Sequence, residues 1–106
     1  VCAAVNDVQV DKVVLSPDFQ FEASDVLAQV TPSTKIIFVC SPNNPTANDI
    51  DRKQIKALLE SGFRGLVVVD EAYADFSDLP SYASLVSQYP NLVVLQTFSK
   101  SWGLAG

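Results

Sequence analysis

The 106-residue sequence has no histidine and no methionine, and it has only two cysteines. Without histidine, this stretch of chain cannot form a Ser-His or Cys-His catalytic pair, and it lacks the ligand of most zinc sites. Two cysteines are too few for a disulfide framework, so a reducing compartment, the cytoplasm, is expected. The start has no initiator methionine, basic leader or cleavage pattern, and we therefore expect an interior segment of a longer protein.

Long apolar runs and clusters of basic residues are also missing. No run approaches the roughly 20 apolar residues of a membrane-spanning helix, so no membrane partner is expected. Seven Lys and Arg face 12 Asp and Glu, and the formal net charge is -5. The bases form no group that could follow the phosphates of a nucleic acid, so no nucleic-acid partner is expected either. With 48% hydrophobic and 18% charged residues, residues 1–106 are expected to form a single globular segment.

Three short apolar runs are typical of strands buried on both faces, at residues 36–40, 66–69 and 92–95. A fourth run, residues 8–15, alternates at first and predicts a strand with one exposed face. Helices are predicted near residues 1–5, 24–30, 51–61 and 80–88. The best marked of these begins with a capping box at Asp51 and Gln54. The strands and helices alternate, which predicts an α/β fold with a mostly parallel sheet.

Polar side chains follow three of these predicted strands. Asn44 comes after the first, Asp70 and Tyr73 after the second, and Lys100 after the third. Taken singly, each has an ordinary explanation as a turn former, a turn cap, a packing residue or a solvated charge. The carboxyl ends of parallel strands meet at one edge of a sheet, where ligands bind in open α/β folds. We therefore predict that these four residues share one edge.

The motifs at these strand ends resemble those of a known family. They read Ser-Pro-Asn-Asn-Pro-Thr at residues 41–46, Asp-Glu-Ala-Tyr at 70–73 and Thr-Phe-Ser-Lys at 97–100. In this order they resemble the fold-type I pyridoxal-phosphate-dependent aminotransferases of class I/II, and they are most similar to the histidinol-phosphate aminotransferase branch. The resemblance implies a three-layer α/β/α fold, with residues 1–106 forming the central part of the cofactor-binding large domain. Ala47 departs from the family pattern, because a glycine usually follows the Asn-Pro-Thr turn.

Roles for particular residues follow from this resemblance. Lys100 matches the catalytic lysine, whose amine holds the aldehyde of pyridoxal 5'-phosphate and then moves protons. Asp70 matches the carboxylate that pairs with the pyridine nitrogen of the cofactor. Asn44 and Tyr73 match the residues that bond its phenolic oxygen.

Three further positions match the cofactor site of the family. Ala72 matches a small residue lying against the ring, and Thr97 and Ser99 match hydroxyls that bind the cofactor phosphate. The rest of the phosphate site and the small domain fall outside these residues. The segment alone is therefore expected to be inactive. No metal site is expected.

The resemblance implies transamination between histidinol phosphate and 2-oxoglutarate, giving imidazole-acetol phosphate and glutamate, in a homodimeric parent protein. Another enzyme of the same fold is an alternative, such as a threonine-phosphate decarboxylase or an aromatic aminotransferase. From a different class, a non-catalytic α/β nucleotide-binding module is possible, although the glycine-rich phosphate loop of such modules is missing. A purely structural fragment is a third alternative. In the family fold, a strand preceding residue 1 separates 8–15 from 36–40, which predicts a gap or rearranged edge there.

Overall fold

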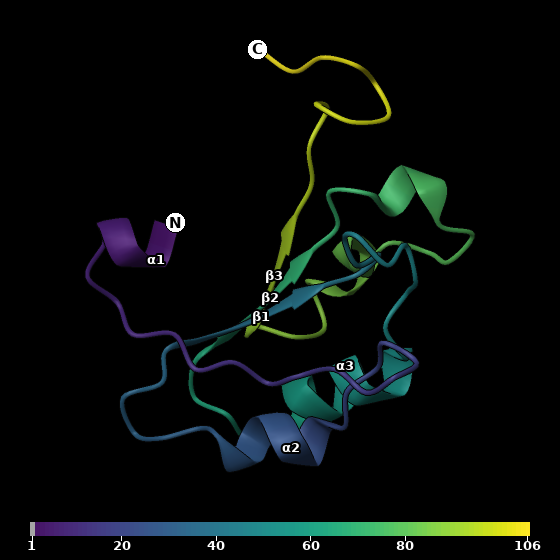
Figure 1. Cartoon of the computed structure of the whole chain (residues 1–106). Coiled ribbons are helices and arrows are strands. Elements are labelled where there is room, and N and C mark those ends of the chain that lie inside the picture. Colours follow the sequence, from purple (N-terminus) through teal and green to yellow (C-terminus); the bar gives the residue numbers. More distant parts are fainter. Residues whose placement is uncertain (1) are drawn as a thin grey trace.

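The computed structural model describes residues 2–106 (Figure 1). Its elements, in chain order, are α1 (Cys2–Val5), α2 (Ala23–Ala28), β1 (Ile36–Cys40), α3 (Arg52–Glu60), β2 (Leu66–Asp70), the 3-10 helices η1 (Ala74–Phe76) and η2 (Tyr82–Leu85), and β3 (Leu92–Leu95). The helix predicted near residues 1–5 is observed from Cys2, and Val1 lies outside the described residues. The helix predicted over 80–88 is present only as the short η2.

The three strands form one parallel sheet in the order β1-β2-β3. Cys40 pairs with Asp70, and Asp70 pairs with Leu95, so the strands end at the same level. The α/β class, the parallel sheet and the three apolar strands are confirmed. The shared edge predicted for the strand ends follows directly from this register.

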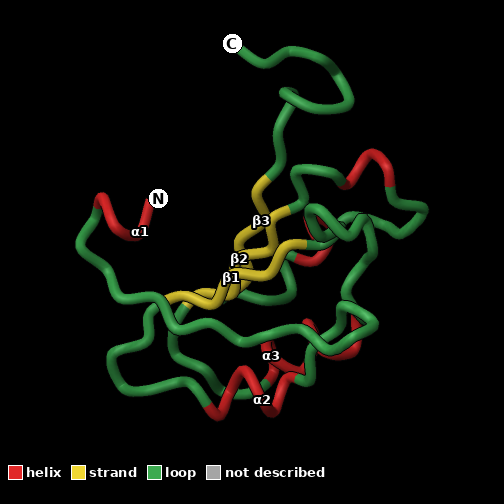
Figure 2. Tube along the Cα trace, viewed as in Figure 1, coloured by secondary structure: helices red, strands yellow, loops and turns green. Residues whose placement is uncertain are grey.

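One face of the sheet is covered by α2 and α3 (Figure 2). Successive strand residues point to opposite faces, and every second residue of β1 and β2 packs toward the helices. The buried side chains on this side are those of Ile37, Val39, Val67, Val69, Ile55, Leu58 and Leu59. Those from α3 recur at helical spacing, as its sequence pattern predicts. Burying a Leu or Ile side chain contributes about 2 kcal/mol, so this layer is the main source of stability.

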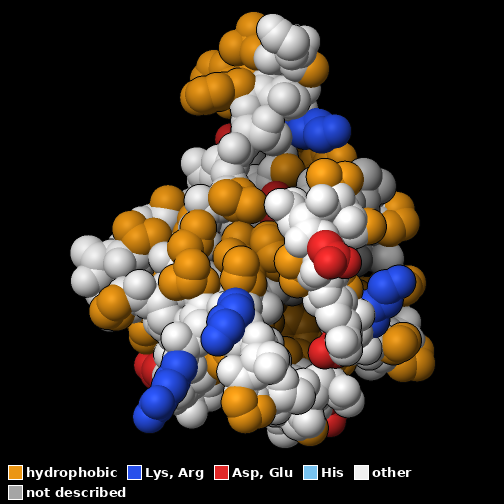
Figure 3. Space-filling view, turned by 90° about the vertical axis from the view of Figure 1, so that its left-hand side faces the viewer, with side chains coloured by type: hydrophobic (Ala, Val, Ile, Leu, Met, Phe, Trp, Pro, Cys, Tyr) orange, Lys and Arg blue, Asp and Glu red, His pale blue; other side chains and the backbone are white. Residues whose placement is uncertain are grey.

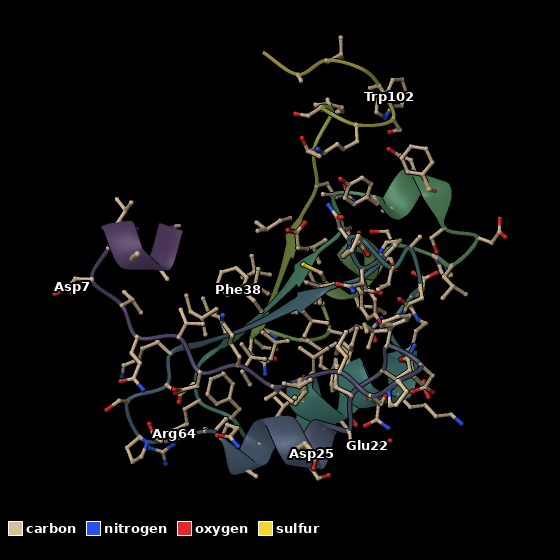
Figure 4. All side chains as sticks on the ribbon, viewed as in Figure 1. Asp7, Glu22, Asp25, Phe38, Arg64 and Trp102 are labelled. Carbon is tan, nitrogen blue, oxygen red and sulfur yellow. The ribbon has the colours of Figure 1, made fainter. Side chains whose placement is uncertain are left out.

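The opposite face of the sheet is exposed at its margins, whereas Val68 in the central strand is 5% exposed. Ile36, Phe38 and Leu66 are 44%, 67% and 41% exposed, and Phe38 points away from α2 and α3 (Figure 4). Hydrophobic side chains gather across the middle of the surface shown in Figure 3. Burial of the strands on both faces was expected, but within residues 2–106 helices cover only one of them. Two of the three layers of the predicted sandwich are therefore present in the described part.

The strand predicted over residues 8–15 is wrong, because this segment is an irregular loop. Val8, Val10 and Val14 are exposed, and Leu15 alone of these apolar residues packs against the core. Alternating side chains make a strand only where another strand supplies hydrogen bonds. Among residues 2–106, β1 pairs with β2 and with no other strand. The open edge expected beside β1 is thus observed.

The capping box predicted for α3 is half correct. The Asp51 carboxylate accepts a hydrogen bond from the Lys53 amide at 2.8 Å, which caps the helix. Gln54 does not bond back to Asp51. Its Oε1 accepts from the Ala23 amide at 2.8 Å, and its Nε2 donates to Glu22 at 2.8 Å. The side chain therefore joins α3 to the start of α2, a tertiary contact that outweighs the local motif.

Ala47, the departure from the family pattern, has a φ of 61°. Alanine pays roughly 1–2 kcal/mol in this left-handed region, while glycine loses about 0.5–1 kcal/mol of backbone entropy on folding. We expect Ala47→Gly to raise the free energy of unfolding by about 0.5–1 kcal/mol in urea titrations. Ala57→Gly, at an exposed position inside α3, is the matched control and should lower it by about 1 kcal/mol. Equal effects of the two changes would contradict this explanation.

Candidate functional site

The first strand-end motif meets the second through a side-chain hydrogen bond. Beyond β1, the chain makes a turn in which the Asn43 carbonyl accepts from the Ala47 amide at 2.8 Å. This turn presents Asn44, and its Nδ2 donates to the Tyr73 hydroxyl at 3.1 Å. Asn44 is exposed and Tyr73 is half-buried. Two residues that are 29 positions apart in sequence are thus joined at the carboxyl edge of the sheet.

The third motif reaches the same tyrosine. The Lys100 Nζ lies 5.5 Å from the centroid of the Tyr73 ring, within the range of a cation–π interaction. Lys100 itself is exposed. Tyr73 is therefore the residue at which the motifs of all three strands come together. The predicted shared edge is observed for Asn44, Tyr73 and Lys100, and their chemical roles remain predictions.

Asp70 lies at the end of the central strand and is half-buried. Its Oδ1 accepts from the Ala72 amide at 3.0 Å, so the side chain caps its own turn, as the simpler interpretation proposed. Its Oδ2 accepts no hydrogen bond from any described residue, which leaves one carboxylate oxygen available to a ligand. Desolvation raises the pKa of the neighbouring Cys40 thiol, and the negative charge of Asp70 raises it further.

Thr97 and Ser99 bond to each other rather than to the other motifs. Their hydroxyls lie 2.8 Å apart, and the Ser99 amide donates to Thr97 Oγ1 at 3.1 Å. The following tail extends beyond the sheet (Figure 1) and is held by a hydrogen bond from Ser101 to Asp75. Trp102 lies on this tail, 64% exposed (Figure 4). The two hydroxyls therefore belong to a local turn, in which Thr97 is half-buried and Ser99 is exposed.

Glu71 had no assigned role, yet it is the one buried carboxylate of the described chain, 4% exposed. The Ser81 hydroxyl, the Tyr82 amide and the Gln96 side chain all donate to it. Two hollows of about 140 and 110 Å³ border it. The strand alternation could have predicted this burial, because positions 67, 69 and 71 point to the same face.

Tyr82, beside Glu71, is 4% exposed, and its hydroxyl has no hydrogen-bond partner in the described part of the chain. The Arg52 guanidinium stacks on its ring at 4.1 Å. Burial raises the pKa of Tyr82 from 10.0 to about 12, although the positive charge of Arg52 opposes this shift. The ionised phenolate is thus disfavoured in the folded state.

This shift predicts a loss of stability in alkali. Between pH 10 and about 12 the unfolded chain releases the Tyr82 proton while the folded chain keeps it, so the free energy of unfolding falls as pH rises. Tyr82→Phe should remove about 2 kcal/mol of that fall. At neutral pH the same change should cost little, because the hydroxyl makes no hydrogen bond to any residue among 2–106. Urea unfolding of wild type and Tyr82→Phe across this pH range tests both expectations. If the two proteins lost the same free energy of unfolding between pH 10 and about 12, the proposed effect of the Tyr82 pKa would be refuted.

The described residues contain no cluster of His, Cys, Asp and Glu able to hold a metal ion. Likewise, none of the helices in residues 2–106 has the length and apolar character needed to cross a membrane.

Comparison with known proteins identifies relatives of the whole chain. The family described as Aminotransferase class I and II matches residues 1–106. The histidinol-phosphate aminotransferase of Bacteroides fragilis is 56% identical over 105 residues, that of Bacteroides thetaiotaomicron 55%, and that of Cytophaga hutchinsonii 51%. Each alignment covers 99% of this chain and 30% of the relative. The chain therefore spans about a third of the length of these relatives.

Proposed function

This chain belongs to the class I and II aminotransferases, and we propose that its parent protein transfers an amino group from histidinol phosphate to 2-oxoglutarate. The products would be imidazole-acetol phosphate and glutamate, in the biosynthesis of histidine. The observation that carries this proposal is the meeting of three strand-end motifs at Tyr73. The choice of substrate is supported by the names of relatives with up to 56% identity.

We also propose where residues 1–106 lie in the parent protein, and in which compartment and oligomeric state that protein acts. Residues 1–106 would be the central part of the large, cofactor-binding domain, and the parent would be a cytoplasmic homodimer. The bare sheet face around Phe38, 67% exposed, supports a larger domain, because runs of this composition are normally covered on both sides.

Pyridoxal 5'-phosphate is the proposed cofactor, and the residues at the sheet edge fit it. The cofactor requires an amine for its aldehyde, an anion for its pyridine nitrogen and donors for its phenolic oxygen. Lys100 offers an exposed amine, and one carboxylate oxygen of Asp70 accepts no hydrogen bond from residues 2–106. Asn44 and Tyr73 offer an amide and a hydroxyl that are already paired. When bound, the cofactor accepts the electron pair that remains after a substrate loses its α-proton.

Each site residue of this chain would have a distinct role toward the cofactor or the substrate. The Asp70 carboxylate would keep the pyridine nitrogen protonated by its negative charge. The flexible Lys100 side chain would carry a proton between the substrate α-carbon and carbon C4′ of the cofactor. Ala72 would leave room for the ring, and Thr97 and Ser99 would donate to the phosphate.

The direct test is the substrate preference of the purified full-length parent. With histidinol phosphate and 2-oxoglutarate, it should form glutamate faster than with any aromatic amino acid as donor. It should release no carbon dioxide from threonine phosphate. Preference for an aromatic donor, or decarboxylation, would favour the corresponding alternative enzyme of this fold. Absence of all three activities in cofactor-loaded protein would reject the proposal.

A further inference from the structure

The buried carboxylate of Glu71 is not explained by the proposed chemistry. It directly follows β2, on the same side as Val67 and Val69 by strand alternation, and is 4% exposed. Within the described part of the chain, no Lys or Arg forms an ion pair with it. A buried charge is costly unless hydrogen bonds replace the water that it has lost. Its surroundings must therefore provide strong donors.

Three neutral donors surround this carboxylate. The Tyr82 amide donates to Oε1 at 2.7 Å, and the Ser81 hydroxyl donates to Oε2 at 2.6 Å. The Gln96 Nε2 also donates to Oε2, at 2.9 Å. Hydrogen bonds to an ionised acceptor are about twice as strong as neutral ones. Glu71 thus fixes two other segments, the start of η2 and the residue that follows β3.

The Glu71–Gln96 hydrogen bond matters because Gln96 is the first residue after β3. The last backbone bond between β2 and β3 runs from the Glu71 amide to the Leu95 carbonyl, at 2.8 Å. The Glu71–Gln96 side-chain bond extends the connection by one residue, and the chain then leaves the sheet toward Lys100. Asp70 directly precedes Glu71, and Lys100 follows Gln96 by four residues. The Glu71–Gln96 bond therefore links the segment that carries the Asp70 carboxylate to the segment that carries the Lys100 amine.

We propose that Glu71 is a positioning residue, whose carboxylate holds the segment of Thr97, Ser99 and Lys100 in register with Asp70 through Gln96. This inference rests on the proposed function. It favours a carboxylate, because the ionised Glu71 accepts from all three donors with charge-assisted hydrogen bonds. An amide at position 71 offers one neutral oxygen, and its NH₂ can be satisfied only if the Gln96 amide turns over or the Ser81 hydroxyl accepts. The isosteric change Glu71→Gln should therefore replace charge-assisted hydrogen bonds with weaker neutral ones, and so loosen the connection without altering the volume.

The connection can be restored with its polarity reversed. In Glu71→Gln/Gln96→Glu, the introduced amide at position 71 can donate to the introduced carboxylate at position 96. The Ser81 hydroxyl, 3.1 Å from Gln96 Nε2, can serve either partner. Recovery in the double variant would identify the pair itself, rather than general stability, as the cause.

The experiment uses the full-length parent with and without pyridoxal phosphate, and it compares wild type, both single variants and the double variant. Glu60→Gln is the matched control, since Glu60 is an exposed carboxylate that accepts from Tyr89. Hydrogen exchange of residues 96–104 should quicken about tenfold in Glu71→Gln, while exchange in α3 stays unchanged. In the loaded enzyme kcat should fall about tenfold, more than KM changes. The double variant should recover most of both losses.

The outcomes separate this inference from the proposed function. If the wild type binds no cofactor and transfers no amino group, the proposed function fails, and the exchange data still decide whether Glu71 holds the segment. If Glu71→Gln matches wild type in exchange and kcat, the positioning role is refuted while the function stands. Equal acceleration throughout the chain would indicate a merely structural carboxylate and also refute it. If Glu71→Gln does not fold, Gln96→Ala, at an exposed position, must show the same local exchange and loss of kcat.

Discussion

Replacing Lys100 with alanine is expected to remove nearly all transamination from the full-length parent, a loss of about 10⁴-fold or more in kcat. The reason is that one amine has two proposed tasks, holding the cofactor aldehyde and carrying the proton. In this chain it is the lysine that approaches Tyr73, with its Nζ 5.5 Å from the ring centroid. The measurements are steady-state turnover and the visible absorbance of the protein-bound cofactor, which should lose its covalently bound form.

The control for this prediction is Lys56→Ala. Lys56 is an exposed lysine of α3 that forms an ion pair with Glu60 at 3.7 Å, and exposed pairs of this kind contribute about 0.3–0.5 kcal/mol. Turnover of this variant should match that of wild type. Near-normal turnover of Lys100→Ala would instead make Lys100 a solvated surface charge and would remove the basis of the cofactor assignment.

Asp70→Asn is expected to leave the cofactor bound but to slow turnover by about 10²- to 10³-fold. A neutral amide cannot stabilise the positive charge on the pyridine nitrogen, so the ring becomes a poorer acceptor of electrons. The fold should survive, because the Oδ1 that accepts from the Ala72 amide at 3.0 Å has an equivalent in asparagine. Turnover is measured together with cofactor absorbance and thermal unfolding.

The reactivity of the Cys40 thiol provides a second measurement on Asp70→Asn. Removing the Asp70 charge removes one of the two causes that raise the pKa of this thiol, so its pKa should fall. Alkylation of Cys40 at a fixed mildly alkaline pH should then be faster than in wild type. Asp78→Asn, at an exposed loop position, should change neither turnover nor alkylation. If Asp70→Asn kept full activity, the proposed role at the pyridine nitrogen would be rejected, and capping the turn at Ala72 would be the remaining role of Asp70.

The sequence by itself predicted those parts of the fold that depend on local pattern. The apolar runs that form β1, β2 and β3 were recognisable, as was the amphipathic α3, because their side chains repeat at the periods of a strand or a helix. Parallel strands with matched ends then bring Asn44, Tyr73 and Lys100 to one edge. The candidate site could be located for this reason, without knowledge of any side-chain contact.

The remaining features depended on partners that are distant in sequence. Residues 8–15 carry a strand-like pattern, but they pair with no strand among residues 2–106, and a strand forms only against a second strand. Gln54 joins α2 instead of completing its capping box, and Glu71 gathers donors from residues 10 to 25 positions away. Local periodicity determines which face of an element is apolar. Only the folded chain determines which donor meets a given acceptor, because hydrogen bonds act over about 3 Å and require both groups in place.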